Sequence, residues 1–585
     1  MNFIKRIFNT KELEKPYYDL YGEMPAHLDY PDKMMHEMVY ETVMKYPHNG
    51  ALQYYGKTLS YKKLYDKIET CAKALKANGV EEGERVTICM PNTPEAIIMF
   101  YAINMAGAVA SMIHPLSSEN EIEFYMDAAN SKYILTVNIF AEKIIKAASR
   151  VNAKKIIIAD VTDGMFKVMQ KTISAYTFVT NLFKENKTSK IEYNDIVVPF
   201  KNFFDTGYGY DGKYKVTNRA SKEAVILYSG GTTGKPKGVV LSNKNFNAEG
   251  MQAFKMTGAK VGEAVLTVMP IFHGFGLGVS VHTELISGMK CILIPAFKVN
   301  EFARLIKLYH PAFLIGVPTM YEGLINNQDN SKYLKCVTNC ICGGDTLKPE
   351  LRNRVNEYLL AHGSNAQIRV GYGLTESVAA TILTPKHYFK EGALGLPFPD
   401  MQIKIIKPGT TKEVRTGKEG EICICGPTVM LGYLNEPEET ANTLKVHPDG
   451  NTYLHTGDVG YKDEEGLIFF TSRLKRMIIS SGYNIYPSFV EKIVDSHPAV
   501  LSCVVVGIPH PYKKQVPVAC IVLRSNFTPS EELTNDIKEY CAKSIAKYSM
   551  PYRYEYIKSV PKTLIGKVNY RKLEEECTKK YSKVK

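Results

Sequence analysis

Residues 229–238 read Ser-Gly-Gly-Thr-Thr-Gly-Lys-Pro-Lys-Gly and constrain the fold more than any other stretch. Apolar runs at 224–228 and 239–241 flank them, so the sequence predicts two strands joined by a glycine-rich loop. Backbone amides in such a loop can hold phosphate oxygens, and its threonines and lysines add hydroxyls and positive charge. We therefore predict a phosphate-binding loop, with a plain glycine and threonine turn as the simpler alternative. The predicted contacts are Ser229, Gly230, Gly231, Thr232, Thr233, Gly234, Lys235 and Lys237.

This loop does not match the Walker A pattern Gly-x-x-x-x-Gly-Lys-Ser/Thr. Ser229 stands where that pattern has its first glycine, and Pro236 replaces the hydroxyl that binds magnesium. No helix is expected directly after the loop either. The sequence therefore predicts a different class of phosphate loop.

Composition limits the remaining possibilities. At 585 residues the chain is several times a typical domain of roughly 150, so more than one domain is expected. The formal charge of +13 is spread along the chain, which favours a solvated basic surface and gives no reason to expect a nucleic-acid partner. Twelve cysteines without paired metal-ligand spacing predict reduced, buried thiols in a cytoplasmic protein. The basic, apolar residues 1–9 lack a signal-peptide core and predict at most a loose membrane contact.

One uncharged stretch, residues 96–113, is long enough to suggest a membrane span. Thr93 and Pro94 instead indicate a helix start, Gly107 indicates a stop, and residues 109–113 have the pattern of a strand. We therefore expect a buried helix followed by a buried strand.

Strand and helix signals alternate from about residue 54 to residue 135, which is typical of a parallel sheet covered on both faces. This pattern predicts a doubly wound α/β fold. It weakens at about 161–218, which we interpret as an insertion over the core, with an amphipathic helix at 165–184. This segment resembles the basic, apolar segment that long-chain acyl-CoA synthetases have just before the phosphate loop, which points to a lipid substrate. A helix that only covers the core is an equally good explanation.

A second glycine-rich motif, Gly-Tyr-Gly-Leu-Thr-Glu, occupies residues 371–376. Tyr372 offers a ring face to adenine, Thr375 a hydroxyl to the α-phosphate, and Glu376 a carboxylate to magnesium. Earlier, Cys-Gly-Gly-Asp at 342–345 ends an expected strand, and its glycines permit close contact between backbone and a ring. The nucleotide contacts expected from these motifs are Gly343, Gly344, Asp345, Gly371, Tyr372 and Gly373.

Together these stretches resemble the adenylate-forming (AMP-binding) acyl-CoA synthetase superfamily, which includes luciferases and peptide-synthetase adenylation domains. The resemblance covers about residues 54–573. It implies that ATP and a carboxylic acid form an acyl adenylate, and that the thiol of coenzyme A then takes the acyl group. Glu376 and Thr232 would hold the Mg²⁺ ion. Gly230 departs from the Ser or Thr that many members carry.

The resemblance also assigns roles further along the chain. Asp458 and Arg473 would hold the ribose hydroxyls, as an acceptor and a forked donor. Lys567, in Pro-Lys-Thr-Leu-Ile-Gly-Lys at 561–567, would be the catalytic lysine that bridges the carboxylate and the α-phosphate. Lys475 matches the pivot between domains and is expected to contact the nucleotide.

Two domains are implied in the same way. The large domain, 1–474, would combine doubly wound sheets with a distorted β-barrel, and the small α+β domain would be 475–585. In the small domain we expect a mixed sheet with helices over 485–523 and another helix at 531–548. Since Lys567 and the thiol channel cannot both face the adenylate, the small domain is expected to rotate about Lys475 between steps. At its surface, His510 and Lys514-Gln515 replace the family's Asp and Gly-Glu.

The substrate is narrowed by His273, which we group with Lys567, Thr375 and Glu376 as catalytic candidates. Members that activate amino acids have an aspartate at the position of His273, and without it a buried ammonium would cost several kcal/mol. Small residues at Gly276, Gly278 and Ser280 would leave room for an acyl chain, unless they serve close packing.

We therefore expect a long- or medium-chain fatty acid, activated by a ligase of the long-chain fatty-acid–CoA type. The alternatives are an aryl-acid CoA ligase, a fatty-acyl-AMP ligase that loads a carrier protein, and a non-catalytic nucleotide-binding protein. A peptide-synthetase adenylation domain is disfavoured, because the amine-binding acid is missing. The sequence does not predict the oligomeric state.

Overall fold

The computed structural model describes residues 25–581, except 166–190, 218, 230–235, 328–331, 477, 482, 548 and 563–567, and the side chains of Lys475, Tyr483 and Asn484. The chain forms two compact units. The first contains Met1–Gln402 and Ile424–Leu454, and the second contains Ile403–Cys423 and His455–Lys585. The division falls within β17 (Gln402–Ile406), β18 (Gly420–Cys425) and β21 (Thr452–Lys462).

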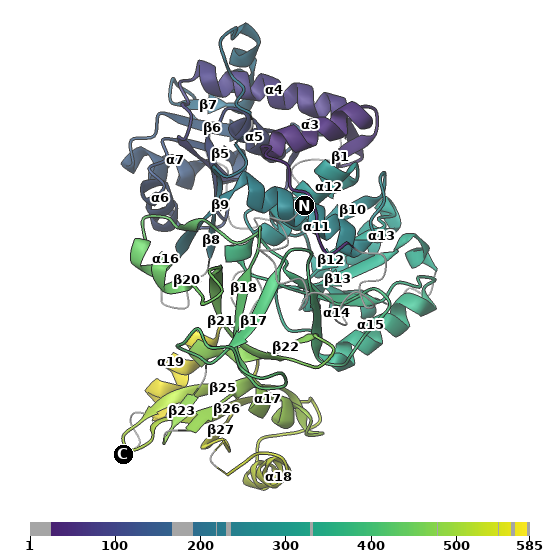
Figure 1. Ribbon diagram of the computed structural model, residues 1–585, viewed down its shortest axis with the longest axis vertical. Coiled ribbons are helices and arrows are strands. Elements are labelled where there is room, and N and C mark those ends of the chain that lie inside the picture. Colours follow the sequence, from purple (N-terminus) through teal and green to yellow (C-terminus); the bar gives the residue numbers. More distant parts are fainter. Residues whose placement is uncertain are drawn as a thin grey trace. The chain divides into compact units, whose positions relative to one another are not determined.

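An eight-stranded sheet of the first unit has the order β19-β9-β8-β4-β3-β5-β6-β7 (Figure 1). The strands from β8 to β7 in this order pair in parallel, whereas β9 pairs antiparallel with both of its neighbours, β8 and β19. Burial on both faces explains their continuous apolar runs and confirms the α/β class. The strands are β3 (Arg85–Cys89), β4 (Val109–Met112), β5 (Tyr133–Val137), β6 (Lys155–Ala159), β7 (Val197–Pro199), β8 (Glu223–Ser229), β9 (Lys237–Ser242) and β19 (Gly432–Tyr433).

The buried helix that the sequence predicted is α5 (Pro94–Met105). The Thr93 side chain caps it by accepting a hydrogen bond from the Ala96 amide at 3.3 Å, and every residue of the helix is buried. β4 follows directly, so both expectations for this stretch are confirmed. Among the described residues, the helices are all too short or too polar to cross a membrane.

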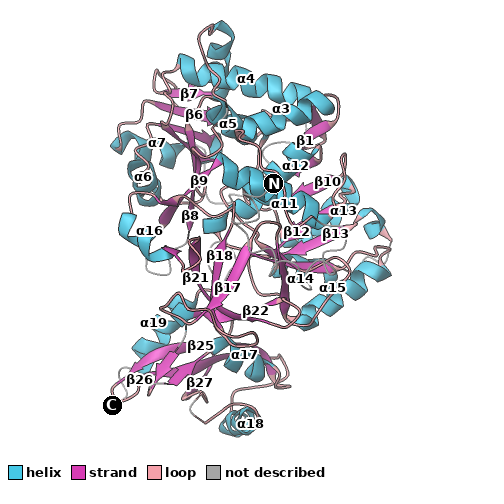
Figure 2. Cartoon of the chain, in the orientation of Figure 1, coloured by secondary structure: helices cyan, strands magenta, loops and turns pink. Residues whose placement is uncertain are grey.

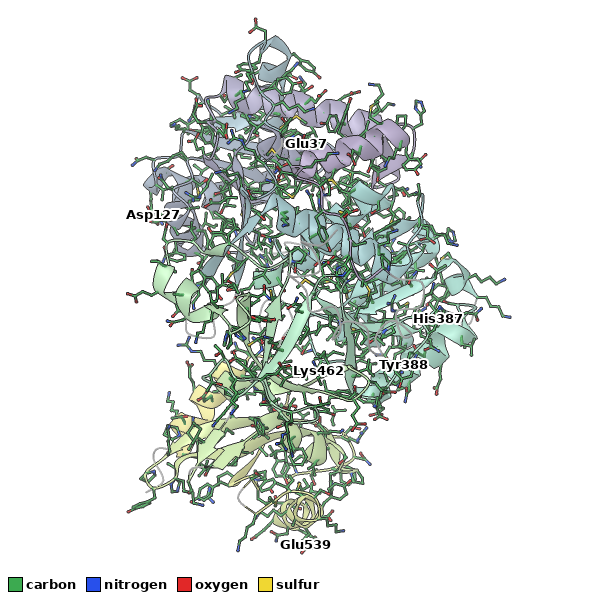
Figure 3. All side chains as sticks on the ribbon, in the orientation of Figure 1. Glu37, Asp127, His387, Tyr388, Lys462 and Glu539 are labelled. Carbon is green, nitrogen blue, oxygen red and sulfur yellow. The ribbon has the colours of Figure 1, made fainter. Side chains whose placement is uncertain are left out.

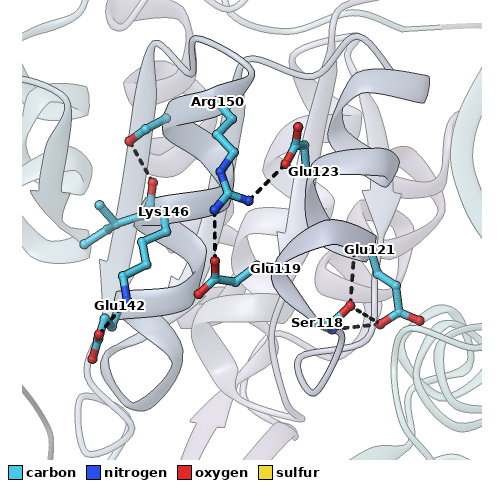
Figure 4. Close-up of polar contacts among 9 residues, drawn as sticks. Ser118, Glu119, Glu121, Glu123, Glu142, Lys146 and Arg150 are labelled. Carbon is cyan, nitrogen blue, oxygen red and sulfur yellow. Dashed lines mark hydrogen bonds and ion pairs between the residues drawn. The ribbon is translucent and has the colours of Figure 1, made fainter.

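Helices α6 (Glu119–Ala128) and α7 (Ala141–Arg150) are tied together by Arg150, as Figure 4 shows. Its guanidinium nitrogens lie 3.2 Å from Glu119 and 3.1 Å from Glu123. Ser118 caps α6 in a reciprocal arrangement with Glu121. Because the ion pairs are largely exposed to solvent, we expect them to contribute little to stability.

The predicted insertion at 161–218 is partly integrated into this sheet. β7 pairs in parallel with β6, and α10 (Phe200–Asp205) and η3 (Thr206–Gly209) follow it. The insertion therefore does more than cover the core, because it supplies an edge strand. The amphipathic helix expected at 165–184 lies almost wholly outside the described residues.

A second sheet of the first unit has the order β16-β15-β14-β13-β12-β10-β11-β1-β2. Strands β11, β10, β12, β13 and β14 pair in parallel, so their carboxyl ends meet at one edge. The strands are β1 (Gly50–Tyr54), β2 (Lys57–Ser60), β10 (Ala264–Thr267), β11 (Lys290–Leu293), β12 (Phe313–Gly316), β13 (Asn339–Cys342), β14 (Ile368–Tyr372), β15 (Ile382–Leu383) and β16 (Ala393–Pro397).

The first helix in the described part of the first unit is α3, and Glu37, labelled in Figure 3, caps it by accepting a hydrogen bond from the Met34 amide. The others cover the two sheets or connect their strands. Their bounds are α3 (Met35–Lys45), α4 (Tyr61–Ala77), η2 (Asn138–Phe140), α11 (Asn243–Thr257), η4 (Phe275–His282), α12 (Thr283–Ser287), η5 (Val299–Glu301), α13 (Phe302–Tyr309), α14 (Pro318–Ile325), η6 (Tyr333–Cys336), α15 (Pro349–Ala361), η7 (Thr375–Ser377) and α16 (Pro437–Thr443), with the short strand β20 (Leu444–Val446).

Helix α11 is unusual in burying a polar face. Asn245 donates 2.8 Å hydrogen bonds to the carbonyls of Pro427 and Val429, and Gln252 donates to the Pro399 carbonyl at 2.5 Å. These amides satisfy buried backbone groups of segments far away in the sequence, which would otherwise be costly. Helix α11 thus connects parts of the first unit that are far apart in the sequence.

The second unit contains a sheet of order β24-β23-β26-β25, with β27 beside β26 (Figure 2). Side chains alternate between its faces: Val505 and Ala519 pack with α17 and α18, whereas Val504 and Val518 pack with α19. The mixed sheet with helices that the sequence predicted here is confirmed, although α18 ends at Ala542. The elements are β22 (Ile468–Arg473), η8 (Leu474–Arg476), β23 (Ile478–Ser480), β24 (Tyr483–Ile485), α17 (Pro487–Asp495), β25 (Val500–His510), β26 (Lys514–Leu523), α18 (Glu531–Ala542), β27 (Arg553–Tyr556) and α19 (Tyr570–Tyr581).

The twelve cysteines all lie within the described ranges and are thiols. All are buried except Cys336 and Cys425, which are partly exposed. The expectation of mostly buried cysteines is therefore confirmed, while their redox state stays a prediction.

Candidate functional site

Two antiparallel strands, β8 and β9, flank the predicted phosphate loop. Their ladder runs as far as the pair Ser229 and Lys237, so both residues lie where the loop leaves the sheet. The predicted strand–loop–strand arrangement is confirmed at these ends. The loop residues Gly230, Gly231, Thr232, Thr233, Gly234 and Lys235 lie outside the described residues.

The second motif lies where the parallel strands β13 and β14 end. A Cβ added to Gly343 would lie 3.1 Å from the Gly371 carbonyl oxygen and 3.4 Å from the Phe275 ring, so glycine keeps the two strand ends in close contact. Ligands of α/β folds bind at such carboxyl edges. Gly344 has a positive φ of 77°, Asp345 after it is exposed, and Tyr372 is partly exposed.

Thr375 and Glu376 form the short helix η7, which contacts both β8 and β9. The structure therefore brings the second motif to the strands that carry the phosphate loop. Gly373 permits this path, because a Cβ there would lie 1.6 Å from the Ala379 carbonyl oxygen. Val378, directly after η7, has φ 66°, a strained conformation for a β-branched residue.

Tyr433 connects the two motifs. Its hydroxyl donates a 2.9 Å hydrogen bond to Oε1 of Glu376, and its ring lies 5.0 Å from Nζ of Lys237. Burial and the Glu376 carboxylate raise the pKa of Tyr433 well above its usual value, so it remains a hydrogen-bond donor. Lys237 also forms an ion pair with Glu439 on α16. Tyr433 therefore contacts both motifs: its hydroxyl binds the Glu376 carboxylate, and its ring lies near the Lys237 ammonium, where the loop enters β9.

Glu249 of α11 supports the turn after η7 from inside the core. It is fully buried, and its Oε1 accepts a 2.9 Å hydrogen bond from the Ala380 amide. Burial raises the pKa of Glu249 well above its usual value and so favours the neutral carboxyl. Nothing in the sequence indicated this role, because a glutamate in a helix is usually exposed.

His273 lies in the turn that leads into η4, a π-helix of eight residues. Its ring lies 4.6 Å from the Phe272 ring, and its carbonyl oxygen accepts the Leu277 amide at 2.8 Å. A Cβ added to Gly276 would lie 2.1 Å from the Pro270 carbonyl oxygen, and one added to Gly278 would lie 2.8 Å from Val378. Close packing of the chain therefore explains these two glycines without an acyl chain.

In the second unit, Asp458 and Arg473 are direct partners across β21 and β22. Nε of Arg473 lies 3.0 Å from Oδ1 of Asp458, and the Asp458 side chain is buried while that of Arg473 is half exposed. Asp458 lies within the long strand β21. Gly457 has φ 70° and interrupts the regular strand geometry just before it. Thr456 anchors this point by donating to the Ile422 carbonyl at 2.6 Å.

The contacts of Lys475 and Lys567, the two lysines predicted to act in the second unit, are not described by the structure. Lys475 belongs to η8, but the structure describes only its backbone. Lys567 lies outside the described residues. Their roles stay predictions. In the first unit, sequence reasoning missed Tyr433 as a site residue, because its contact with Glu376 spans 57 positions.

Taken together, the parallel sheets and the glycine-rich motifs at their strand ends have the arrangement expected of a nucleotide-phosphate site of the α/β class. Comparison with known proteins agrees with that class. The AMP-binding enzyme model matches residues 39–434, and the AMP-binding enzyme C-terminal domain model matches residues 490–567. The chain therefore belongs to the AMP-binding enzyme family.

Individual relatives cover almost the whole chain. A long-chain-fatty-acid–CoA ligase of Bacillus subtilis (strain 168) is 30% identical over 97% of this chain and 99% of its own length. The 4-coumarate–CoA ligase 4 of Arabidopsis thaliana is 28% identical over 90% of this chain and 88% of its own. The crystal structure of ATP-bound MatB from Rhodopseudomonas palustris has a TM-score of 0.79 at 23% identity, covering 94% and 99% of the two chains, and so shares the fold.

Proposed function

We propose that the protein is an ATP-dependent acyl-CoA synthetase that activates a long- or medium-chain fatty acid through an acyl-AMP intermediate. The products would be acyl-CoA, AMP and pyrophosphate. An AMP-forming CoA ligase that uses ATP, coenzyme A and a small carboxylic acid is supported by the family and by relatives that span nearly the whole chain.

The observation that carries the proposal is Tyr433, whose hydroxyl binds Glu376 and whose ring lies 5.0 Å from Nζ of Lys237. A carboxylate and a cation at the end of a glycine-rich loop supply what a magnesium–triphosphate complex needs. Neither motif alone would distinguish a nucleotide site from an ordinary turn.

The oxygen donors fit a hard cation. Glu376 and Thr232 would hold Mg²⁺, which prefers carboxylate and hydroxyl oxygens together with phosphate. When bound, the ion would neutralise phosphate charge. The neutral Glu249 would keep the turn after η7 in place, and Thr375 would donate its hydroxyl to the α-phosphate. Tyr372 would offer its ring to adenine, while Asp458 and Arg473 would bind the ribose hydroxyls.

The catalytic step needs a charge that bridges the two reacting groups. Lys567 would contact both the substrate carboxylate and the α-phosphate, where negative charge develops during attack. A single stabiliser of this kind is worth about two to three powers of ten in rate. We propose further that rotation at Lys475 exchanges Lys567 for the thiol acceptor between the two steps, with the domain boundary at 474/475.

Two lines support a fatty acid. The first relative is named for long-chain fatty acids and is 30% identical. In addition, His273 replaces the acid that would bind a substrate ammonium. A 4-coumarate ligase at 28% identity keeps an aryl acid as the second candidate. A carrier protein in place of coenzyme A would leave the first step unchanged.

The experiment is pyrophosphate release from the purified full chain across straight-chain acids of increasing length and a set of aryl acids, with and without coenzyme A. We expect release with medium or long chains and acyl-CoA formation when coenzyme A is present. Preference for aryl acids would redirect the substrate proposal. If ATP bound and no acid gave a mixed anhydride, the proposed reaction would be wrong.

A further inference from the structure

The turn between β25 and β26 gathers exposed aromatic and cationic side chains. Tyr512 at its centre is 92% exposed, and the backbone runs from His510 to Lys514. The His510 ring lies 5.4 Å from the ring of Tyr552, which precedes β27. Nζ of Lys513 lies 5.5 Å from the same ring. The turn and the start of β27 therefore form one surface.

Arg553 extends this surface, with its guanidinium carbon 4.7 Å from the Tyr552 ring. Within the described residues, Lys513, Lys514 and Arg553 form no ion pair with a carboxylate. By contrast, Arg571 and Lys580 of the same unit each pair with a glutamate. We call this surface the cationic turn. It consists of His510, Tyr512, Lys513, Lys514, Tyr552 and Arg553.

The backbone of the turn gives a second, independent observation. Lys514 has φ 68°, in the left-handed region that glycine tolerates and residues with a Cβ avoid. The family pattern has Gly-Glu where this chain has Lys514-Gln515. A lysine therefore occupies a strained backbone conformation that glycine would adopt without strain. Strained residues of this kind tend to occur where the side chain has a function.

We propose that the cationic turn docks the second unit onto an anionic lipid surface. Tyr512 would lie at the level of the headgroups, where amphipathic rings are favoured. Lys513, Lys514 and Arg553 would face the lipid phosphates, and each such cation contributes about fivefold to partitioning. The inference goes beyond the proposed function and does not depend on which acid is activated.

The test is co-sedimentation of the full chain with vesicles of phosphatidylcholine alone and of phosphatidylcholine mixed with phosphatidylglycerol. We expect binding to the mixed vesicles only, weakening as salt is added. The double variant Lys513→Gln/Lys514→Gln should lower the partition coefficient about 25-fold, from two cations at about fivefold each. The control Lys543→Gln/Lys558→Gln removes the same charge from exposed positions outside the turn and should bind like the wild type.

The single variant Lys514→Gly separates charge from folding. It should weaken vesicle binding about fivefold while raising the unfolding temperature, because the strain at this position is relieved. Its activity with dissolved acid should be unchanged.

Three outcomes would overturn the proposal. The first is equal wild-type binding to both kinds of vesicle, or to neither. The second is equal loss of binding in the turn and control double variants. The third is unchanged vesicle binding in the turn variant with a raised KM for coenzyme A or loss of contact with an acidic carrier protein, which would assign the turn to the thiol acceptor. Failure of the proposed reaction would instead appear as missing pyrophosphate release in every variant.

Discussion

Replacing Glu249 tests whether a neutral carboxyl in the core holds the turn that carries Thr375 and Glu376. Glutamine retains an oxygen that accepts the 2.9 Å hydrogen bond from the Ala380 amide. Methionine has a similar size and no such acceptor. Glu249→Gln should therefore keep activity near pH 7. Glu249→Met should lose about 1–3 kcal/mol of stability, the usual cost of leaving a buried donor unsatisfied.

The pH dependence gives the sharper result. Burial raises the pKa of Glu249 well above its usual value. The unfolded chain therefore releases this proton at a lower pH than the folded chain does. The contribution of Glu249 to the unfolding free energy is fully present below the ordinary carboxyl pKa. It is lost as the pH rises towards the raised pKa of the folded protein. Between those two values, each pH unit lowers the unfolding free energy of the wild type by about 1.4 kcal/mol relative to Glu249→Gln.

The assay is denaturant unfolding of both proteins at several points between about pH 5 and pH 6, above the ordinary carboxyl range. Other groups titrate in both proteins, so only the difference between them reports on Glu249. We expect the unfolding free energy of Glu249→Gln to rise by about 1.4 kcal/mol relative to that of the wild type across this interval. The reasoning would be refuted if the unfolding free energy of Glu249→Gln minus that of the wild type stayed constant or fell as the pH rises. Either result would mean that the native carboxyl is ionised.

Three further variants test the site. Lys567→Ala should slow adenylation by about two to three powers of ten and spare thiol transfer from supplied acyl adenylate, and equal loss of both steps would contradict a role confined to the first. Tyr433→Phe removes the 2.9 Å hydrogen bond to Glu376, and we expect it to raise the magnesium concentration needed for half-maximal pyrophosphate release, whereas an unchanged requirement would separate Glu376 from the metal. Gly276→Ala would place a Cβ 2.1 Å from the Pro270 carbonyl oxygen and should lower the unfolding temperature and the activity on every acid alike. Selective loss of long chains from a stable Gly276→Ala variant would restore the idea that this glycine makes room for the acyl chain.

Much of the fold follows from local patterns in the sequence. The buried helix α5 has its Thr93 cap and Pro94 start, and the strands around the phosphate loop are continuous apolar runs, so periodicity was sufficient. The edge strand β7 was missed because three residues in a polar region carry too little periodicity to register.

The site was predictable where glycine and charge occur together in a short stretch. Residues that act across long separations were not. Glu249 reaches Ala380 over 131 positions, and Tyr433 reaches Glu376 over 57. No local pattern announces such a contact, because it depends on which helix face the fold buries. Asp458 was predicted from the family resemblance, but its ion pair with Arg473 depends on the register of β21 and β22, which no local pattern indicates.

The buried amides of α11 affect the order in which the chain can mature on the ribosome. Asn245 needs the carbonyls of Pro427 and Val429, which are synthesised more than 180 positions later. A nascent chain that stops near residue 402 would expose those amide donors and the apolar surface beside them. Fragments cut at that point should bind chaperones or aggregate, and a soluble recombinant first unit would need to include residues 424–454.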